Sequence, residues 1–352
     1  MNNWKTFPHD GSAYIYAGAS LQENWEDRVV AKAGNVEPTR KIKTGIFIQS
    51  LKFFNSTEVN LTGYIWQRYE DGLHDGIKPG PGEIGFILPE QVDSGFEPQE
   101  SYRLRLAQEE IIGWYFEATL RQPFDYSTYP FDHKTVWVRL WHKQFSRNIV
   151  LVPDFEAYKA TGPADIFGIE EEIVLETWER ENTFFDYQLS SYDTDFGITN
   201  YVGQQGFPEL HYNFIVKRKF ENAFIVYLLP LFLVATLLFA ALLTISGRAE
   251  LSERFGFSVS GFIGAASALF FVVMLAHIQL REQFAGSGIV YIEYFYILMY
   301  ALLVAATANT YFFSLQPKRW CGFILYDDNI LVKVAYWPVV LGCLILITLG
   351  VT

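Results

Sequence analysis

The stretch ELHYNFIVKRKFENAFIVYLLPLFLVATLLFAALLTI, residues 209–245, contains the change that decides the fold of this chain. Its first part, Glu209–Phe220, reads as a β-strand, and Glu209–Phe214 alternates polar and apolar side chains with the period of two that a strand has. Its second part, Phe224–Ile245, is an almost uninterrupted apolar run, near the roughly 20 residues that cross a bilayer as an α-helix. The sequence therefore predicts a β domain that leads directly into a membrane.

Four long apolar segments make up the C-terminal part of the chain. They cover about 221–245, 255–280, 289–314 and 330–351. A helix in a soluble core would carry a polar stripe, and the first and fourth segments carry almost none. We therefore expect a transmembrane domain of residues 220–352 with four spans, in a multi-pass protein of the lipid bilayer.

The residues before the first span predict an all-β domain. Thr44–Tyr69 contains two period-two runs joined by a polar turn, the pattern of a β-hairpin. In KTVWVRLW, residues 134–141, three apolar side chains fall on one face, and Trp137, Arg139 and Trp141 fall on the other. We expect residues 1–40 to lead into an immunoglobulin-like β-sandwich of residues 41–219.

Composition argues against nucleic-acid binding and catalysis. The net charge is -12, whereas a nucleic-acid partner would require a basic face. The histidines at 74, 133, 142 and 211 have no nucleophile or carboxylate at motif spacing, and the β region resembles no nucleotide-binding loop. We expect no enzyme activity and no required cofactor.

An acidic run at Glu170, Glu171 and Glu172 is followed by Asp193 and Asp195. These carboxylates could bind a divalent cation such as calcium, which would then act as a modulator. A solvated acidic surface has the same pattern, and the sequence leaves both readings open.

Basic residues indicate the topology. Lys318 and Arg319 place the loop between the third and fourth spans in the cytoplasm, and Arg248 places the first loop on the same side. Lys217–Lys219 then lie on the extracytoplasmic side, although basic residues are usually enriched on the cytoplasmic side. No apolar secretion segment precedes Trp4, so an extracytoplasmic β domain implies a native start that is missing or has been removed.

A loop motif and the arrangement of domains resemble the pentameric ligand-gated ion channels, the Cys-loop receptor superfamily. That family has an aromatic-Pro-Phe-Asp tip between two bracket positions, the second of them four residues after the Asp. In QPFDYSTYPFDHKTV, residues 122–136, the tip is Tyr129–Asp132 and the brackets are Gln122 and Val136. Both brackets are cysteine in the animal receptors, so the chain is similar to the bacterial branch without the disulfide.

A second spacing supports the resemblance. The family has an Arg twelve residues before a Pro of the first span, and Arg218 and Pro230 have this separation. The resemblance implies that Arg218 pairs with Asp132 at the domain boundary, where a partly buried ion pair is structurally specific. Alternatively, Lys217–Lys219 contact lipid headgroups.

The second apolar segment has a face suited to a pore. Steps of four and three residues select two hydroxyl side chains among apolar ones, a stripe that could line a water path. The predicted pore-lining residues are Gly256, Ser260, Ile263, Ser267, Phe270 and Met274. Small residues in this segment could equally serve close helix packing. The resemblance implies a pentamer in which Glu253 forms a ring of carboxylates that favours cations, and Ile263 forms the constriction.

The resemblance also implies how the channel is gated. A small molecule or ion binds between neighbouring β domains beneath a hairpin at about Tyr192–Phe207, where Tyr192, Phe196 and Tyr201 are available. Contacts at the domain boundary then pass the change to the second span. The predicted coupling residues are Asn55, Ser56, Thr57, Tyr129, Pro130, Phe131, Asp132, Arg218 and Gly286. We expect a homopentamer in a bacterial inner membrane with the β domain in the periplasm.

Two other classes of membrane protein fit the sequence less well. A membrane-anchored sensor is the alternative, but the short loop between the third and fourth spans leaves little in the cytoplasm to signal with. A membrane enzyme would need several catalytic side chains, and the third span has a single acid, Glu293. We expect Glu293 to pair with a neighbouring residue or to lie at the membrane interface.

Overall fold

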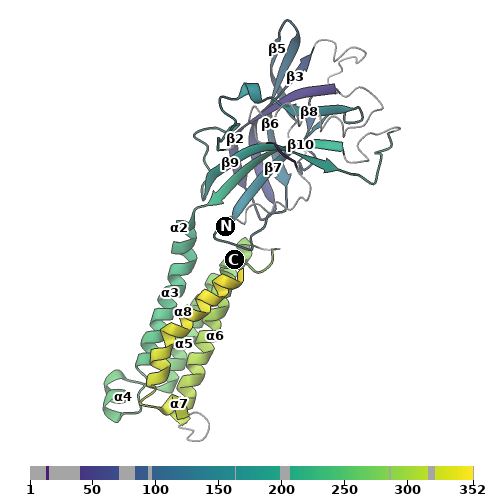
Figure 1. Ribbon diagram of the computed structural model, residues 1–352. Helices are drawn as coiled ribbons and strands as arrows, with labels where there is room; N and C mark the ends of the chain where they lie inside the picture. Colours follow the sequence, from purple (N-terminus) through teal and green to yellow (C-terminus); the bar gives the residue numbers. More distant parts are fainter. Residues whose placement is uncertain are drawn as a thin grey trace. The chain divides into compact units, whose positions relative to one another are not determined.

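The computed structural model describes residues 13–15, 40–70, 84–93, 97–162, 164–198, 207–284, 287–315 and 322–351. The chain divides into two compact units (Figure 1). The β unit comprises Met1–Phe124 and His133–Lys217, and the membrane unit comprises Asp125–Asp132 and Arg218–Thr352. The predicted border between residues 219 and 220 lies close to this division, which in addition places the loop 125–132 with the helices.

Two antiparallel-rich sheets form the β unit, as the alternation of its sequence predicts. In the described residues the strands are β1 (Ala13–Ile15), β2 (Arg40–Phe53), β3 (Glu58–Glu70), β4 (Phe86–Ile87), β5 (Gln99–Arg105), β6 (Glu109–Arg121), β7 (His133–His142), β8 (Ile149–Pro153), β9 (Trp178–Ser190) and β10 (Phe207–Arg218). One sheet has the order β1-β9-β10-β7-β4 and the other β5-β6-β3-β2-β8. The hairpin predicted at Thr44–Tyr69 is the antiparallel pair β2 and β3.

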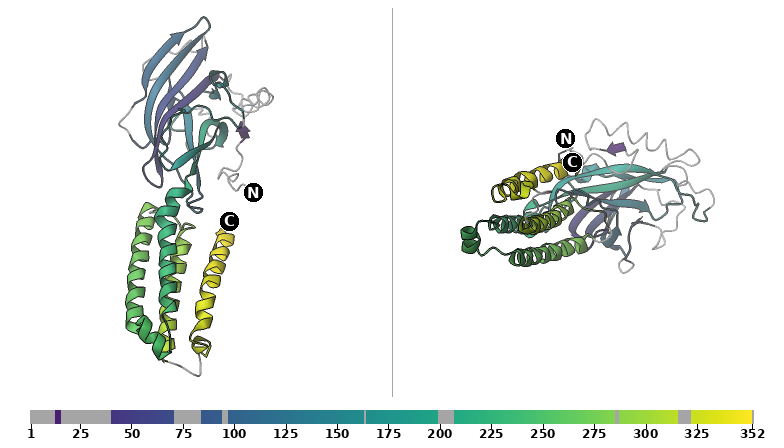
Figure 2. Two further views of the ribbon diagram at one scale, coloured as in Figure 1. Left: turned by 90° about the vertical axis from the view of Figure 1, so that its left-hand side faces the viewer. Right: turned by 90° about the horizontal axis from the view of Figure 1, so that it is seen from below.

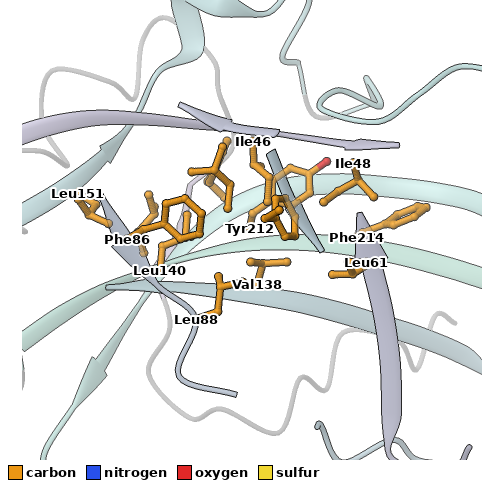
Figure 3. Packing of buried hydrophobic residues seen from close by; sticks show 14 of the residues in the cluster. Ile46, Ile48, Leu61, Phe86, Leu88, Val138, Leu140, Leu151, Tyr212 and Phe214 are labelled. Carbon is orange, nitrogen blue, oxygen red and sulfur yellow. The ribbon is translucent and has the colours of Figure 1, made fainter. Parts of the chain in front are cut away.

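A hydrophobic core joins the two sheets (Figure 3). Ile46 and Leu61 enter it from β2 and β3, and Val138 and Phe214 enter it from β7 and β10. The predicted inward face of β7 is correct, because Val138 and its neighbours two residues away on either side are each at most 2% exposed. Each such buried side chain stabilises the fold by about 1.5–3 kcal/mol.

The membrane unit contains four described helices that are long and apolar enough to cross a membrane, which confirms the predicted spans (Figure 2). They are Phe220–Leu243, Val259–Gln283, Glu293–Leu315 and Ile330–Val351. The first combines α2 (Phe220–Ala223), a π-helical turn η4 (Phe224–Leu228) and α3 (Leu229–Leu243); the other three are α5, α6 and α8. The π-helical turn ends two residues before Pro230, which lacks the N–H that a regular helix uses.

The second span begins later than the sequence predicts. A separate short helix, α4 (Ala249–Phe255), ends at Gly256, which has a φ of 63°. Ser258 then caps α5 by accepting a hydrogen bond from Gly261 N at 3.1 Å. Because Gly256 adopts the left-handed conformation that glycine tolerates, it ends α4 and lies outside α5. The prediction that Gly256 begins the helical stripe is therefore wrong.

Candidate functional site

The loop Asp125–Asp132 is the centre of the candidate site. Its own hydrogen bonds shape it: Asp125 Oδ1 accepts from Ser127 N at 2.8 Å, and Tyr129 N and Phe131 N donate to carbonyls three residues earlier. An aspartate that bonds the backbone two residues on is a common turn former. The loop is continuous in the chain with β6 and β7, yet it packs within the membrane unit.

Arg218 and Asp132 form the predicted pair. Arg218 Nε lies 2.6 Å from Asp132 Oδ1, and Nη2 lies 3.1 Å from Oδ2. The two side chains are 8% and 1% exposed, and the guanidinium carbon lies 4.8 Å from the ring centroid of Tyr129. A fork-to-fork geometry of this kind is what a buried charge pair requires to offset its loss of hydration.

Aromatic contacts fix the loop on two other parts of the membrane unit. The ring centroids of Tyr129 and Phe284, just after α5, are 4.5 Å apart. Phe131 stacks on Phe220 at 5.0 Å with an interplanar angle of 13°, and Tyr291 N donates to a loop carbonyl at 2.9 Å. The loop thus touches the start of the first span and both ends of the connector between α5 and α6.

Burial also keeps the loop tyrosines neutral. Burial raises the pKa of Tyr126 to about 12, with the nearby Asp132 carboxylate acting in the same direction. Burial also raises the pKa of Tyr129, so both rings stay uncharged against Phe284 even in alkaline solution. The single negative charge at the tip is that of Asp132, which faces Arg218.

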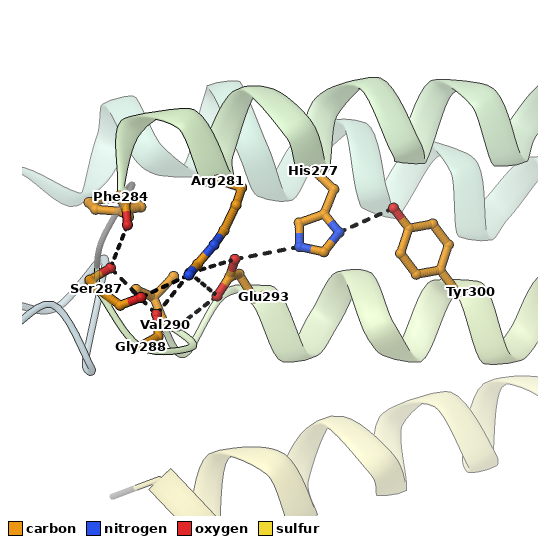
Figure 4. A network of polar contacts seen from close by, with 8 residues as sticks. All are labelled: His277, Arg281, Phe284, Ser287, Gly288, Val290, Glu293 and Tyr300. Carbon is orange, nitrogen blue, oxygen red and sulfur yellow. Dashed lines mark hydrogen bonds and ion pairs between the residues drawn. The ribbon is translucent and has the colours of Figure 1, made fainter.

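The connector itself is held by Arg281 (Figure 4). Its Nη1 donates to Gly288 O at 2.9 Å, and its Nη2 donates to Ser287 O at 2.8 Å. Nη1 also lies 3.4 Å from each carboxylate oxygen of Glu293. Glu293 in turn accepts from Val290 N at 2.8 Å, as the acidic residue of a capping box does at a helix N-terminus.

His277 extends this network along α5 and α6 (Figure 4). Its Nε2 lies 3.5 Å from Glu293 Oε1, and its Nδ1 lies 3.2 Å from the Tyr300 hydroxyl. Its ring also stacks on that of Tyr296, at 5.1 Å between centroids. The expectation that Glu293 pairs with a neighbour is confirmed, since Arg281 and His277 both approach it. Gly286 lies outside the described residues.

The predicted hairpin turn belongs to the β unit. Asn55 Oδ1 accepts hydrogen bonds from Thr57 N at 2.8 Å and from Glu58 N at 2.9 Å, which closes the turn around Ser56. Asn55 and Thr57 are exposed. Thr57 O accepts from Gln122 N at 2.7 Å, so the turn is fixed to the first residue of the loop motif.

The predicted pore face of α5 is largely exposed in the single chain. Ser260, Ile263 and Ser267 are exposed, whereas Phe262, Ala266, Val273 and Leu280 are buried on a neighbouring face, roughly a quarter to a third of a turn away. Further along, Met274 is half-buried. Ile263, Ser267 and Phe270 also border an apolar groove of about 610 Å³ against Leu303, Thr307 and Tyr311 of α6. Glu253 is exposed on α4.

An aromatic cluster in the β unit contains two of the predicted ligand residues. The rings of Tyr192 and Phe196 lie 5.8 Å apart and each packs edge-on against Trp141, at 5.6 and 6.2 Å. Phe145 closes the group at 5.7 Å from Phe196. Trp141 and Phe145 were not predicted; the placement of Trp141 on the outward face of its strand was the available signal. Tyr201 lies outside the described residues.

Charged groups adjoin this cluster. Arg139 lies over the Trp141 ring, 5.5 Å from its centroid, and donates to Glu209 Oε2 at 3.1 Å and also to Glu90. Tyr192 donates to Glu209 Oε1 at 2.7 Å. Burial raises the pKa of Glu90 against the opposing charge of Arg139. With both carboxylates ionised, this group carries one more negative than positive charge.

The predicted calcium ligands do not assemble. The part of the chain that the structure describes has no group of three or more His, Cys, Asp or Glu residues that could hold a metal ion. Glu170, Glu171 and Glu172 therefore form no such site there, and Asp195 Oδ1 accepts from Gly197 N at 2.8 Å as a turn residue.

Comparison of the chain with models of protein families and with curated protein sequences finds no match.

Proposed function

We propose that the chain is the subunit of a ligand-gated ion channel, cation-selective and homopentameric, with its β unit outside the cytoplasm. The observation that carries the proposal is the loop 125–132, which belongs to β6 and β7 in sequence and to the membrane unit in packing. A ligand that changes the β unit therefore acts on a segment that touches the end of α5.

Gating would use the contacts of this loop. The Arg218–Asp132 pair ties the loop to the first span, and Tyr129 and Phe131 tie it to the connector residues Phe284 and Tyr291. A movement of the loop is passed to α5 through Phe284. A ligand drives this movement only by binding the open and closed states with different affinity.

Conduction would use the exposed face of α5. Ser260 and Ser267 supply hydroxyls, and a ring of Ile263 side chains closes the path by dewetting. Glu253, exposed on α4, would form the carboxylate ring that raises the local concentration of cations.

The aromatic cluster supports a small organic cation as ligand. Trp141, Tyr192 and Phe196 offer ring faces and edges beside Glu209, and the surrounding charge is negative by one when both glutamates are ionised. Aromatic rings next to carboxylates favour ammonium groups. Trp141→Ala should raise the half-activating amine concentration roughly tenfold, at constant single-channel current.

The test is electrical. The purified chain is reconstituted in lipid vesicles, and current is recorded while primary and quaternary amines, calcium and pH are stepped. We expect amine-dependent cation current, continuous current in Ile263→Ala, and weaker cation preference in Glu253→Gln. Silence under all ligands, together with a monomeric mass in detergent, would refute the channel.

A further inference from the structure

Asp328, in the turn before α8, holds the segment that joins the first span to α4. Its Oδ2 accepts from Ser246 Oγ at 2.7 Å, and its Oδ1 accepts from Gly247 N at 2.6 Å. Its carbonyl accepts from Lys333 Nζ at 3.0 Å, and Lys333 also donates to Ile245 O at 2.7 Å. The start of the fourth span is thus bonded to three consecutive residues after the first span.

The Ser246 hydroxyl connects Asp328 to the N-terminus of α4. Because Ser246 Oγ donates to the carboxylate, a lone pair remains for Arg248 N, which donates to it at 3.2 Å. Arg248 is the N-cap of α4, and its carbonyl accepts from Leu251 N and Ser252 N. Asp328 therefore restrains the backbone that leads into the first turn of α4, through Ser246 and Gly247.

The backbone that presents Asp328 is strained. Asp327, Asp328 and Asn329 have φ values of 40°, 61° and 66° in succession. Asp and Asn tolerate the left-handed conformation better than other non-glycine residues, but three in succession persist only where their surroundings hold them. Asn329 is fully buried, and the bonds of Asp328 to Ser246 and Gly247 supply a further restraint.

The Asp328 carboxylate is ionised, as an acceptor of two hydrogen bonds at the start of α4 should be. Burial opposes its ionisation, but the hydrogen bonds from Ser246 and Gly247 and the charges of Lys333 and Arg248 outweigh burial and lower its pKa. The carboxylate therefore stays ionised and keeps two acceptor oxygens. At its other end, α4 is closed by Gly256, and Phe257 N donates back to Ser252 O at 3.0 Å.

We propose that Asp328 is a positioning residue for ion selectivity: through Ser246 and Gly247 it orients α4, and with it Glu253. This inference rests on the proposed channel function. Asp328 itself need not touch the permeating ion, because its bonds to the start of α4 suffice. The turn that begins the fourth span would thereby set the geometry of the carboxylate ring without lining the pore.

The experiment measures reversal potentials under a potassium chloride gradient for reconstituted wild type and variants. Asp328→Asn keeps one acceptor oxygen and replaces the other by a donor, so one of the two bonds is lost. Ser246→Ala removes the relay without changing any charge. Asp327→Asn is the matched control, since Asp327 shares the left-handed turn and contacts Arg248 at 3.3 Å on the surface.

We expect Asp328→Asn and Ser246→Ala to shift the reversal potential toward zero, in the direction of Glu253→Gln, and Asp327→Asn to leave it unchanged. Adding Asp328→Asn to Glu253→Gln should produce no further shift, because residues that act through one group are not additive. An additive shift, or a wild-type value in Ser246→Ala, would overturn the inference. A wild type that conducts nothing would instead refute the channel itself.

Discussion

Asp132 in the membrane unit and Asp186 in the β unit are both buried, but the groups around them differ in charge. Asp132 in the membrane unit is 1% exposed and meets the guanidinium of Arg218 through both oxygens. Asp186 on β9 is 5% exposed and accepts from the amide of Asn213 at 2.7 Å, with His211 Nδ1 3.8 Å away. Burial raises the pKa of Asp186 to about 6, against the hydrogen bond from Asn213.

The two surroundings differ in whether the carboxylate must stay ionised. An ion pair makes removal of either partner costly, because the other charge is then stranded in a dry site. A carboxylate held by an amide can take up a proton and keep its hydrogen bond. Asp132, on the loop that the proposed mechanism moves during gating, has the first arrangement, and Asp186 has the second.

Removing the charge of Asp132 should have the largest effect. Asp132→Asn leaves the Arg218 guanidinium buried without its counter-charge, so we expect a loss of about 3–5 kcal/mol in the free energy of unfolding. Thermal melting of the purified protein in detergent measures it. The matched control is Asp125→Asn, in the other Pro-Phe-Asp copy, where an exposed side chain accepts from Ser127 N and the amide oxygen can replace it. Equal losses in both variants would contradict the comparison.

Asp186→Asn should raise the free energy of unfolding, whereas Asp132→Asn lowers it. The folded pKa of about 6 exceeds the ordinary 3.8, so the folded state binds the proton more tightly and stability falls as pH rises from about 4 to about 6. The asparagine can still accept from Asn213 and carries no charge. We expect a gain of up to about 3 kcal/mol at pH 7 and a flatter pH dependence between 4 and 6, measured by melting across pH. A variant that is less stable than wild type at pH 7 would show that the ionised carboxylate is stabilising.

Local patterns were sufficient to predict the β region and the spans. The period of two in residues 134–141 and the apolar runs both follow from neighbours in sequence. The pair of Arg218 and Asp132 could be predicted because the tip motif and the Arg-Pro spacing together resemble a known family. The sequence could not show whether Gly256 continues the second span or ends a separate helix, because glycine occurs in both places.

Contacts made by distant segments could not be predicted in this way. The cluster of Trp141 with Tyr192 and Phe196 depends on the antiparallel pairing of β7 with β10 and on a turn after β9. The bonds from Asp328 to Ser246 and Gly247 join residues about 80 positions apart. The π-helical turn at Phe224–Leu228 leaves no mark in an apolar run.

Arg281 tests whether a half-exposed cation on a buried carboxylate behaves like Arg218. Its side chain is 44% exposed, whereas that of Glu293 is 4% exposed. Arg281→Gln removes the charge facing Glu293 and the bonds to the connector carbonyls, and we expect a loss of about 1–2 kcal/mol by melting, between the effects of buried and surface pairs. Arg281→Lys keeps the charge without the fork and should lose less. A loss as large as that of Asp132→Asn would mean that exposure does not separate the two pairs.

The smallest effect is expected at a surface pair in the β unit. Lys43 Nζ lies 3.2 Å from Glu156 Oε2, but the side chains are 48% and 74% exposed. Water already solvates both charges and salt screens them, so Glu156→Gln should change the free energy of unfolding by less than about 0.5 kcal/mol. Melting at low and high salt checks this, because any residual contribution should vanish as ionic strength rises. A loss comparable to that of Arg281→Gln that persists at high salt would mean that burial does not determine how much a charge pair stabilises the fold. The difference between Asp132 and Asp186 would then have to come from the geometry of their contacts.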